Sequence, residues 1–85
     1  MTKVTIYTTT YCGFCRLAKE LLERKAVPYQ EVDVTHDDAE RARIETLTGQ
    51  RTWPQIFIGK THVGGFTDMS KLDRDGVLDG MLNAG

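Results

Sequence analysis

Hydrophobic and polar positions alternate along the chain with two periods, one of two residues and one close to 3.6. The two-residue period and the β-branched or aromatic residues of segments 3–8, 29–34, 55–59 and 60–64 predict strands. The longer period predicts helices over residues 13–26, 37–48 and 67–82. Elements in the order β-α-β-α-β-β-α predict an α/β fold, with a four-stranded mixed sheet flanked by helices.

Each predicted helix has an apolar face that is expected to pack on the sheet. The first helix should end before Pro28, because a residue preceding proline is pushed out of the helical region, and the second should stop at Gly49. Thr67 is expected to be the N-cap of the third helix, which Gly76 and Gly80 should interrupt or fray. The residues expected to face inward are Phe14, Ala18, Leu21, Leu22, Ile44, Leu47, Met69, Leu72, Val77, Leu78 and Met81.

Length and charge restrict the class of protein. A chain of 85 residues predicts a single domain over 1–85. Eleven basic and twelve acidic side chains give a net charge of -1, which offers no field of one sign to nucleic acid or to an anionic membrane. With no apolar run of membrane-spanning length and no leader-like start, we expect a cytoplasmic protein. We also expect it to be a monomer. A chain from which an organellar leader had been removed would look the same.

The two cysteines lie where the first predicted strand gives way to the first helix. A disulfide between Cys12 and Cys15 would stabilise the fold little, by about 2 kcal/mol, because the loop that it closes is short. His36 and His62 lack the close spacing that would complete a zinc site. A thiol at the first turn of a helix is favoured as the thiolate, and residues three apart there reach disulfide distance. Redox chemistry is therefore predicted, with metal binding or an inert pair as the alternatives.

Two later segments offer groups that would bind a ligand beside the thiols. A cis Trp53–Pro54 bond at the start of a strand would leave the Trp53 backbone free to pair with an extended peptide, although an ordinary turn also accounts for Pro54. In segment 63–68, glycines precede Thr67 and Asp68 at a helix N-terminus. The amides there suit a carboxylate and Asp68 suits an ammonium, as in an α-amino acid, although a plain loop and N-cap is the alternative.

The motifs YCGFC, RTWPQIFI and GGFTD, in this order and spacing, resemble a small dithiol glutaredoxin of the bacterial type over essentially the whole chain. The resemblance implies a thioredoxin-like fold and a glutathione-dependent thiol-disulfide oxidoreductase that reduces glutathione mixed disulfides and protein disulfides. Glutathione would be the reductant, with no permanently bound cofactor. Cys12 would exchange with glutathione mixed disulfides, and Cys15 would complete the reduction of protein disulfides. The implied glutathione-binding residues are Tyr11, Phe14, Arg41, Arg51, Thr52, Trp53, Pro54, Gly65, Thr67 and Asp68.

Two departures from the family pattern keep other interpretations open. Thr9 stands where the family often has lysine, so Cys12 would depend more on the helix amides. Gly13-Phe14 replaces the more familiar proline-tyrosine and is similar to the CGFS motif of single-thiol relatives. One alternative is therefore a 2Fe-2S carrier, a dimer in which Cys12 of both chains and two glutathiones hold the cluster. The single-thiol carriers lack a cysteine at the position of Cys15. We therefore rank the carrier interpretation second. The other is a glutaredoxin-like electron donor to ribonucleotide reductase, itself reduced by thioredoxin reductase.

Overall fold

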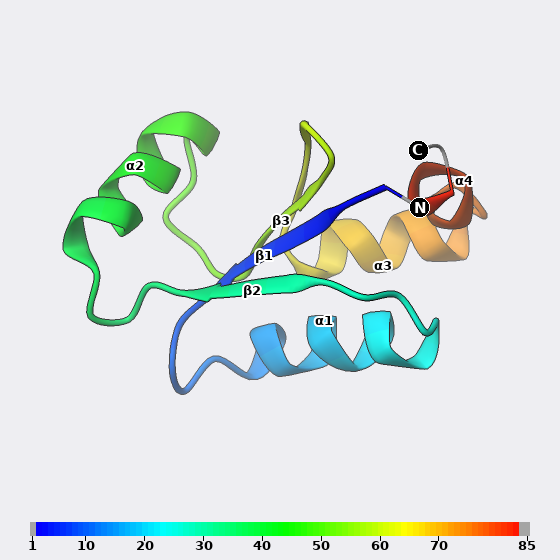
Figure 1. Cartoon of the computed structure of the whole chain (residues 1–85), viewed down its shortest axis with the longest axis horizontal. Helices are drawn as coiled ribbons and strands as arrows, with labels where there is room; N and C mark the ends of the chain where they lie inside the picture. Colours follow the sequence, from blue (N-terminus) through cyan, green and yellow to red (C-terminus); the bar gives the residue numbers. More distant parts are fainter. Residues whose placement is uncertain (1, 84–85) are drawn as a thin grey trace.

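The computed structural model describes residues 2–83 and has the predicted order of strands and helices. Its four-stranded sheet has the strand order β2-β1-β3-β4, with β1 parallel to β2 and antiparallel to β3. The last predicted helix is divided into two. The elements shown in Figure 1 are β1 (Val4–Thr8), α1 (Gly13–Arg24), β2 (Gln30–Asp33), α2 (Asp38–Thr48), β3 (Gln55–Ile58), β4 (Thr61–Gly64), α3 (Phe66–Arg74) and α4 (Leu78–Leu82).

The main apolar core lies between one face of the sheet and helices α1, α3 and α4. Along β1 the residues alternate between buried and half-buried, so that Val4 and Ile6 point into this core. Burying such a side chain contributes about 1.5–3 kcal/mol. Helix α2 lies on the other side of the sheet (Figure 1), and Ile44 is its one buried residue. The core residues are Val4, Ile6, Ala18, Leu21, Leu22, Val27, Ile56, Ile58, Met69, Leu78 and Leu82.

Three residues that the helical pattern predicts to face inward are exposed. Phe14 is 55% exposed, because it lies in the first turn of α1, where Cys15 instead takes the inward position. Leu47 is 62% exposed, because α2 meets the sheet through Ile44 alone and leaves the next turn without a surface to pack on. Val77 is 46% exposed, because it is the N-cap of a new helix rather than part of a continuous one.

Some of the helices begin or end at other residues than the sequence predicts. The N-cap of α3 is Gly65, two residues before the expected Thr67, so Thr67 lies inside the first turn of the helix. Gly76 follows α3 with a φ of 75°, a conformation that glycine adopts readily, and separates it from α4 as predicted. Gly80 lies within α4 and does not interrupt it. Helix α2 ends at Gly49 as predicted. Within residues 2–83, every helix is too short or too polar to span a membrane.

Candidate active site

The cysteine pair is placed by the turn that connects β1 to α1. Cys12 is the N-cap of α1 and has extended backbone angles, while Cys15 lies one turn into the helix. Their Cα atoms are 5.2 Å apart and their sulfurs are paired as a disulfide, so the predicted ability of the pair to close is confirmed. Cys12 is half-buried, whereas Cys15 is only 2% exposed. An external reactant therefore meets Cys12.

The surroundings of Cys12 favour negative charge on its sulfur. The Cys15 backbone N–H donates to Cys12 Sγ over 3.1 Å, as a capping interaction. The first turn of α1 contains no acidic residue, so the partial positive charge of the helix N-terminus is not offset there. Among the described residues, no group of three or more histidine, cysteine or acidic side chains is placed to hold a metal ion.

Trp53 lies next to this sulfur from across the molecule. The Trp53 carbonyl oxygen is 3.5 Å from Cys12 Sγ, and the Trp53–Pro54 bond is cis rather than part of an ordinary turn. Strand β3 begins at Gln55, so Trp53 lies outside the ladder between β1 and β3. Its backbone is thus beside the thiols at the entrance to the sheet, while Pro54 is buried behind it.

A cleft of about 230 Å³ extends from Trp53 to the start of α3. The rings of Phe14 and Phe66, which both line this cleft, are stacked with centroids 6.2 Å apart. Sequence reasoning missed Phe66 and Gln50 in this cleft. Phe66 lies within the GGFTD motif and is an apolar residue next to a helix start, but Gln50 gave no signal. The lining residues are Phe14, Gln50, Thr52, Trp53, Gly65, Phe66, Thr67 and Asp68.

Asp68 is held at the mouth of α3 by the glycines before it. Its Oδ2 accepts a hydrogen bond from the Gly65 N–H over 2.9 Å. Gly64 has a φ of 112°, and a Cβ added there would overlap the Asp68 carboxylate. The position that requires glycine is therefore Gly64, whereas a Cβ on Gly65 would make an ordinary contact. Asp68 is exposed and lines the cleft.

Four residues that the resemblance assigns to glutathione binding lie outside the cleft lining, and one of them is the buried Pro54. Arg41 donates to the Thr35 carbonyl oxygen over 2.9 Å and pairs with Asp38 over 2.6 Å. Arg51 lies beside the end of α2. Tyr11 is fully exposed on the turn before Cys12, with a φ of 62°. The cleft itself thus contains six of the ten assigned residues: Phe14, Thr52, Trp53, Gly65, Thr67 and Asp68.

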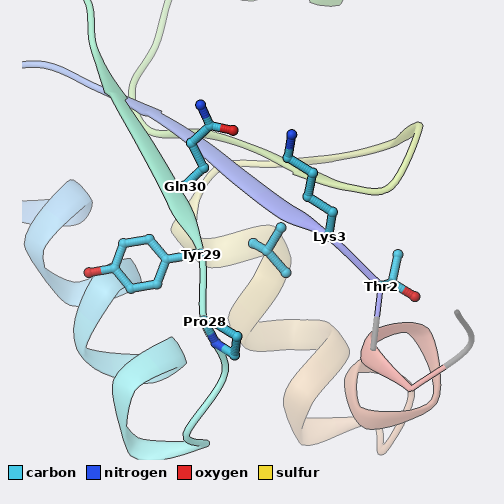
Figure 2. Close-up of a pocket in the computed structure, with 6 residues that line it drawn as sticks. Thr2, Lys3, Pro28, Tyr29 and Gln30 are labelled. Carbon is cyan, nitrogen blue, oxygen red and sulfur yellow. The ribbon is translucent and has the colours of Figure 1, made fainter.

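A second hollow, of about 270 Å³, lies at the other end of β1 (Figure 2). Thr2, Lys3 and Gln30 are among its lining residues, and none of its lining side chains is a thiol. Tyr29 is turned toward α1 and donates to Glu23 over 2.8 Å. Burial, and then this hydrogen bond to a carboxylate, raise the pKa of Tyr29 to about 12. The hollow is a feature of the end remote from the cysteines.

Comparison with known proteins agrees with this geometry. The family model of the glutaredoxins matches residues 4–63. The chain belongs to the glutaredoxin family. A glutaredoxin of Neisseria meningitidis is 48% identical over 84 residues, which cover 98% of this chain and 99% of that protein. A glutaredoxin of Pseudomonas aeruginosa is 46% identical, with 99% of this chain and all of that protein covered.

A solved structure extends the similarity to three dimensions. The buckwheat glutaredoxin–glutathione complex matches with a TM-score of 0.91 and 36% identity, covering 95% of this chain and 76% of that one. The thioredoxin-like fold implied by the sequence is therefore confirmed. Membership of the glutaredoxin family, together with the Cys12–Cys15 pair, makes the protein a thiol-disulfide oxidoreductase.

Proposed function

We propose that this glutaredoxin is glutathione-dependent and reduces both glutathione mixed disulfides and protein disulfides. The observation that carries the proposal is the cleft, which joins the backbone beside Cys12 to the first turn of α3 and Asp68. A tripeptide with a thiol in the middle and an α-amino-acid group at one end has groups to suit both. The solved structure of the buckwheat relative, which is a complex with glutathione, supports the same ligand.

The proposed pose follows from the chemistry of each end. The cysteine residue of glutathione pairs with the Trp53 backbone as a short added strand. Its γ-glutamyl carboxylate meets the free amides at the start of α3, and its ammonium meets Asp68. Arg41 reaches the glycine carboxylate only by exchanging its present partner, Asp38, for it. Arg51 and Tyr11 are proposed to border the same end.

Two exchange reactions follow, each conserving its electrons. The Cys12 thiolate attacks the glutathione sulfur of a mixed disulfide, which forms Cys12–S–S–glutathione and releases the protein thiolate. A second glutathione thiolate then attacks that glutathione sulfur, giving oxidised glutathione and the Cys12 thiolate. On a protein disulfide, the Cys12 thiolate attacks one sulfur and forms a mixed disulfide with it, and the other sulfur of the broken disulfide leaves as a thiolate. The Cys15 thiolate then attacks Cys12, releases the protein thiolate and leaves the Cys12–Cys15 disulfide, which two glutathiones reduce.

The proposed benefit of an acidic Cys12 is easier departure. For thiols in general, a lower pKa raises the thiolate fraction at neutral pH, but intrinsic nucleophilicity falls by a similar factor. Attack therefore gains almost nothing. A sulfur of low pKa leaves a mixed disulfide readily, so Cys12 is both attacked and displaced with ease.

Mass spectrometry of the Cys15→Ser variant tests the proposal. Incubated with oxidised glutathione, this variant should gain one glutathionyl group and lose it on addition of reduced glutathione. The matched Cys12→Ser variant, which keeps the buried thiol, should gain none. An unmodified Cys15→Ser protein, or equal labelling of both variants, would contradict the proposal. Anaerobic incubation with iron, sulfide and glutathione tests the carrier alternative. A brown dimer would support that alternative, and a colourless monomer would contradict it.

A further inference from the structure

A buried amide lies beneath the loop that lines the cleft. Gln55 is the first residue of β3 and is 0% exposed. Its Nε2 donates to the Thr52 carbonyl oxygen over 2.8 Å and to Gln50 Oε1 over 3.0 Å. Gln50 and Thr52 both line the cleft, in a segment that is neither helix nor strand. The buried Gln55 amide thus anchors two residues of the cleft lining by hydrogen bonds.

The orientation of this amide is fixed by its partners. A backbone carbonyl can only accept, so the atom of Gln55 that faces Thr52 must be the nitrogen. The amide oxygen then faces His62, whose Nε2 lies 2.6 Å away. Since Oε1 can only accept, His62 Nε2 must carry a proton. His62 lies on β4, half-buried, with its ring against Phe57 at a centroid distance of 5.1 Å.

We propose that Gln55, oriented by His62, is a positioning residue for the cleft. The imidazole N–H fixes the amide oxygen, and the amide nitrogen then fixes the segment that carries Gln50 and Thr52. The inference rests on the proposed glutathione dependence, because it concerns how that ligand is received. The oxygen and the nitrogen of the Gln55 amide both have partners, and the nitrogen also lies 3.3 Å from Thr52 Oγ1.

The hydrogen bonds of Gln55 and His62 indicate whether ligand binding or sulfur exchange depends on them. These bonds end at Gln50 and Thr52 of the cleft lining, and within the described residues no hydrogen bond joins Gln55 or His62 to either cysteine. Loss of the His62 donor should therefore weaken binding of the glutathione moiety and leave sulfur exchange within the bound complex intact. In kinetic terms, KM for the glutathione substrate rises while kcat is maintained.

Nuclear magnetic resonance tests the orientation directly. At about pH 8.5, above the range in which an ordinary histidine titrates, the ring nitrogens of His62 should show a protonated Nε2 and an unprotonated Nδ1. The side-chain amide protons of Gln55 should exchange slowly with solvent in the unmodified protein and rapidly in His62→Leu. A neutral ring protonated on Nδ1, or amide protons that exchange at the same rate in both proteins, would overturn the inference.

Kinetics with a glutathionylated peptide test the consequence. His62→Leu should raise KM by about three- to tenfold, the effect of losing one hydrogen bond, with kcat held within about twofold. His62→Gln places an amide N–H near the same point and should restore KM. Equal effects of leucine and glutamine, or a fall in kcat alone, would overturn the positioning role while the proposed function stands. Absence of any turnover with glutathione in the unmodified protein would instead refute the proposed function and this inference together.

Discussion

The two ends of the molecule have opposite character. Helices α1 and α3 run side by side in the same direction (Figure 1), so both N-termini lie at the thiol end, which comprises the cysteine turn, residues 50–54 and the start of α3. At the opposite end, Lys25 follows α1 and pairs with Asp73 over 2.7 Å and with Asp79 over 2.9 Å. Tyr29 and Glu23 are linked there too. One end thus presents the first-turn amides of two helices, which have no partner within their own helix, and the other end joins the helices together.

This difference indicates a division between chemistry and stability. Partial positive charge at helix N-termini favours a thiolate and a bound carboxylate, so it is useful where it is left unsatisfied by the protein. Ion pairs that join α1 to α3 and α4 hold the frame in which those N-termini are aligned. Substitutions at the thiol end should therefore change activity, and substitutions at the opposite end should change stability.

The largest effect is expected from the cysteines themselves. Cys12→Ser should reduce all disulfide exchange to background, because the attacking and leaving sulfur is removed. Cys15→Ser should retain the reduction of glutathione mixed disulfides and lose most reduction of protein disulfides, which requires the resolving thiol. Turnover of a glutathionylated peptide and of a protein disulfide by both variants measures the split. Equal loss of both activities in Cys15→Ser would contradict the assigned roles.

The next effect is expected at Asp68, on the same end. Asp68→Asn keeps an oxygen that can accept from Gly65 N–H but removes the charge that would attract the ligand ammonium. KM for the glutathionylated peptide should rise about tenfold, with a smaller change in kcat. Asp68→Ala, the matched variant, should raise KM similarly and lower the melting temperature as well. If Asp68→Asn left KM unchanged, the carboxylate would serve only as a cap.

At the opposite end, a smaller and purely structural effect is expected from Lys25. Its hydrogen bonds to Asp73, and then to Asp79, raise the pKa of Lys25 above its usual value. Lys25→Met keeps much of the aliphatic stem and removes the ammonium, so the melting temperature should fall modestly while KM and kcat stay unchanged. Thermal unfolding, alone and in high salt, provides the measurement. A change in kinetics with no loss of stability would remove the distinction between the two ends.

The smallest effect is a pH dependence that belongs to Tyr29. Burial and then the bond to Glu23 raise its pKa to about 12, above the ordinary value near 10. Because the folded state prefers the neutral phenol, its contribution is complete below pH about 10 and is lost as the pH rises toward about 12. Denaturant unfolding of Tyr29→Phe should therefore show a weaker decline across this window than the unmodified protein. If the stability of Tyr29→Phe and of the unmodified protein fell equally across this window, a group other than Tyr29 would cause the alkaline sensitivity.

The order of elements was predictable because sheet and helix periods are local properties of the chain. The strands and the stop of α2 at Gly49 needed no knowledge of neighbours. Phe14, Leu47 and Val77 have the hydrophobicity of core residues and sit in helical patterns, yet whether a helix turn meets the sheet is decided by packing between distant segments. No single-sequence pattern carries that information.

In the candidate active site, too, local features were predictable from the sequence and contacts between distant segments were not. The cysteines, Trp53 and Asp68 were marked by motifs whose chemistry is readable from residue type and spacing. Gln50 joins them only because the segment before β3 folds back toward α3, which no local signal announces. Arg41 has the right charge, but the structure gives its guanidinium to Asp38 and Thr35, a competition that the sequence alone does not reveal.

The burial of the second sulfur sets a sequence of events in time. A visiting chain touches Cys12 and has no route to Cys15, so each encounter opens at the same atom. In the proposed reaction with protein disulfides, Cys15 then releases the bound protein itself, so release needs no further molecule from solution. Because the fold buries one of the two sulfurs, Cys12 reacts first and Cys15 reacts last.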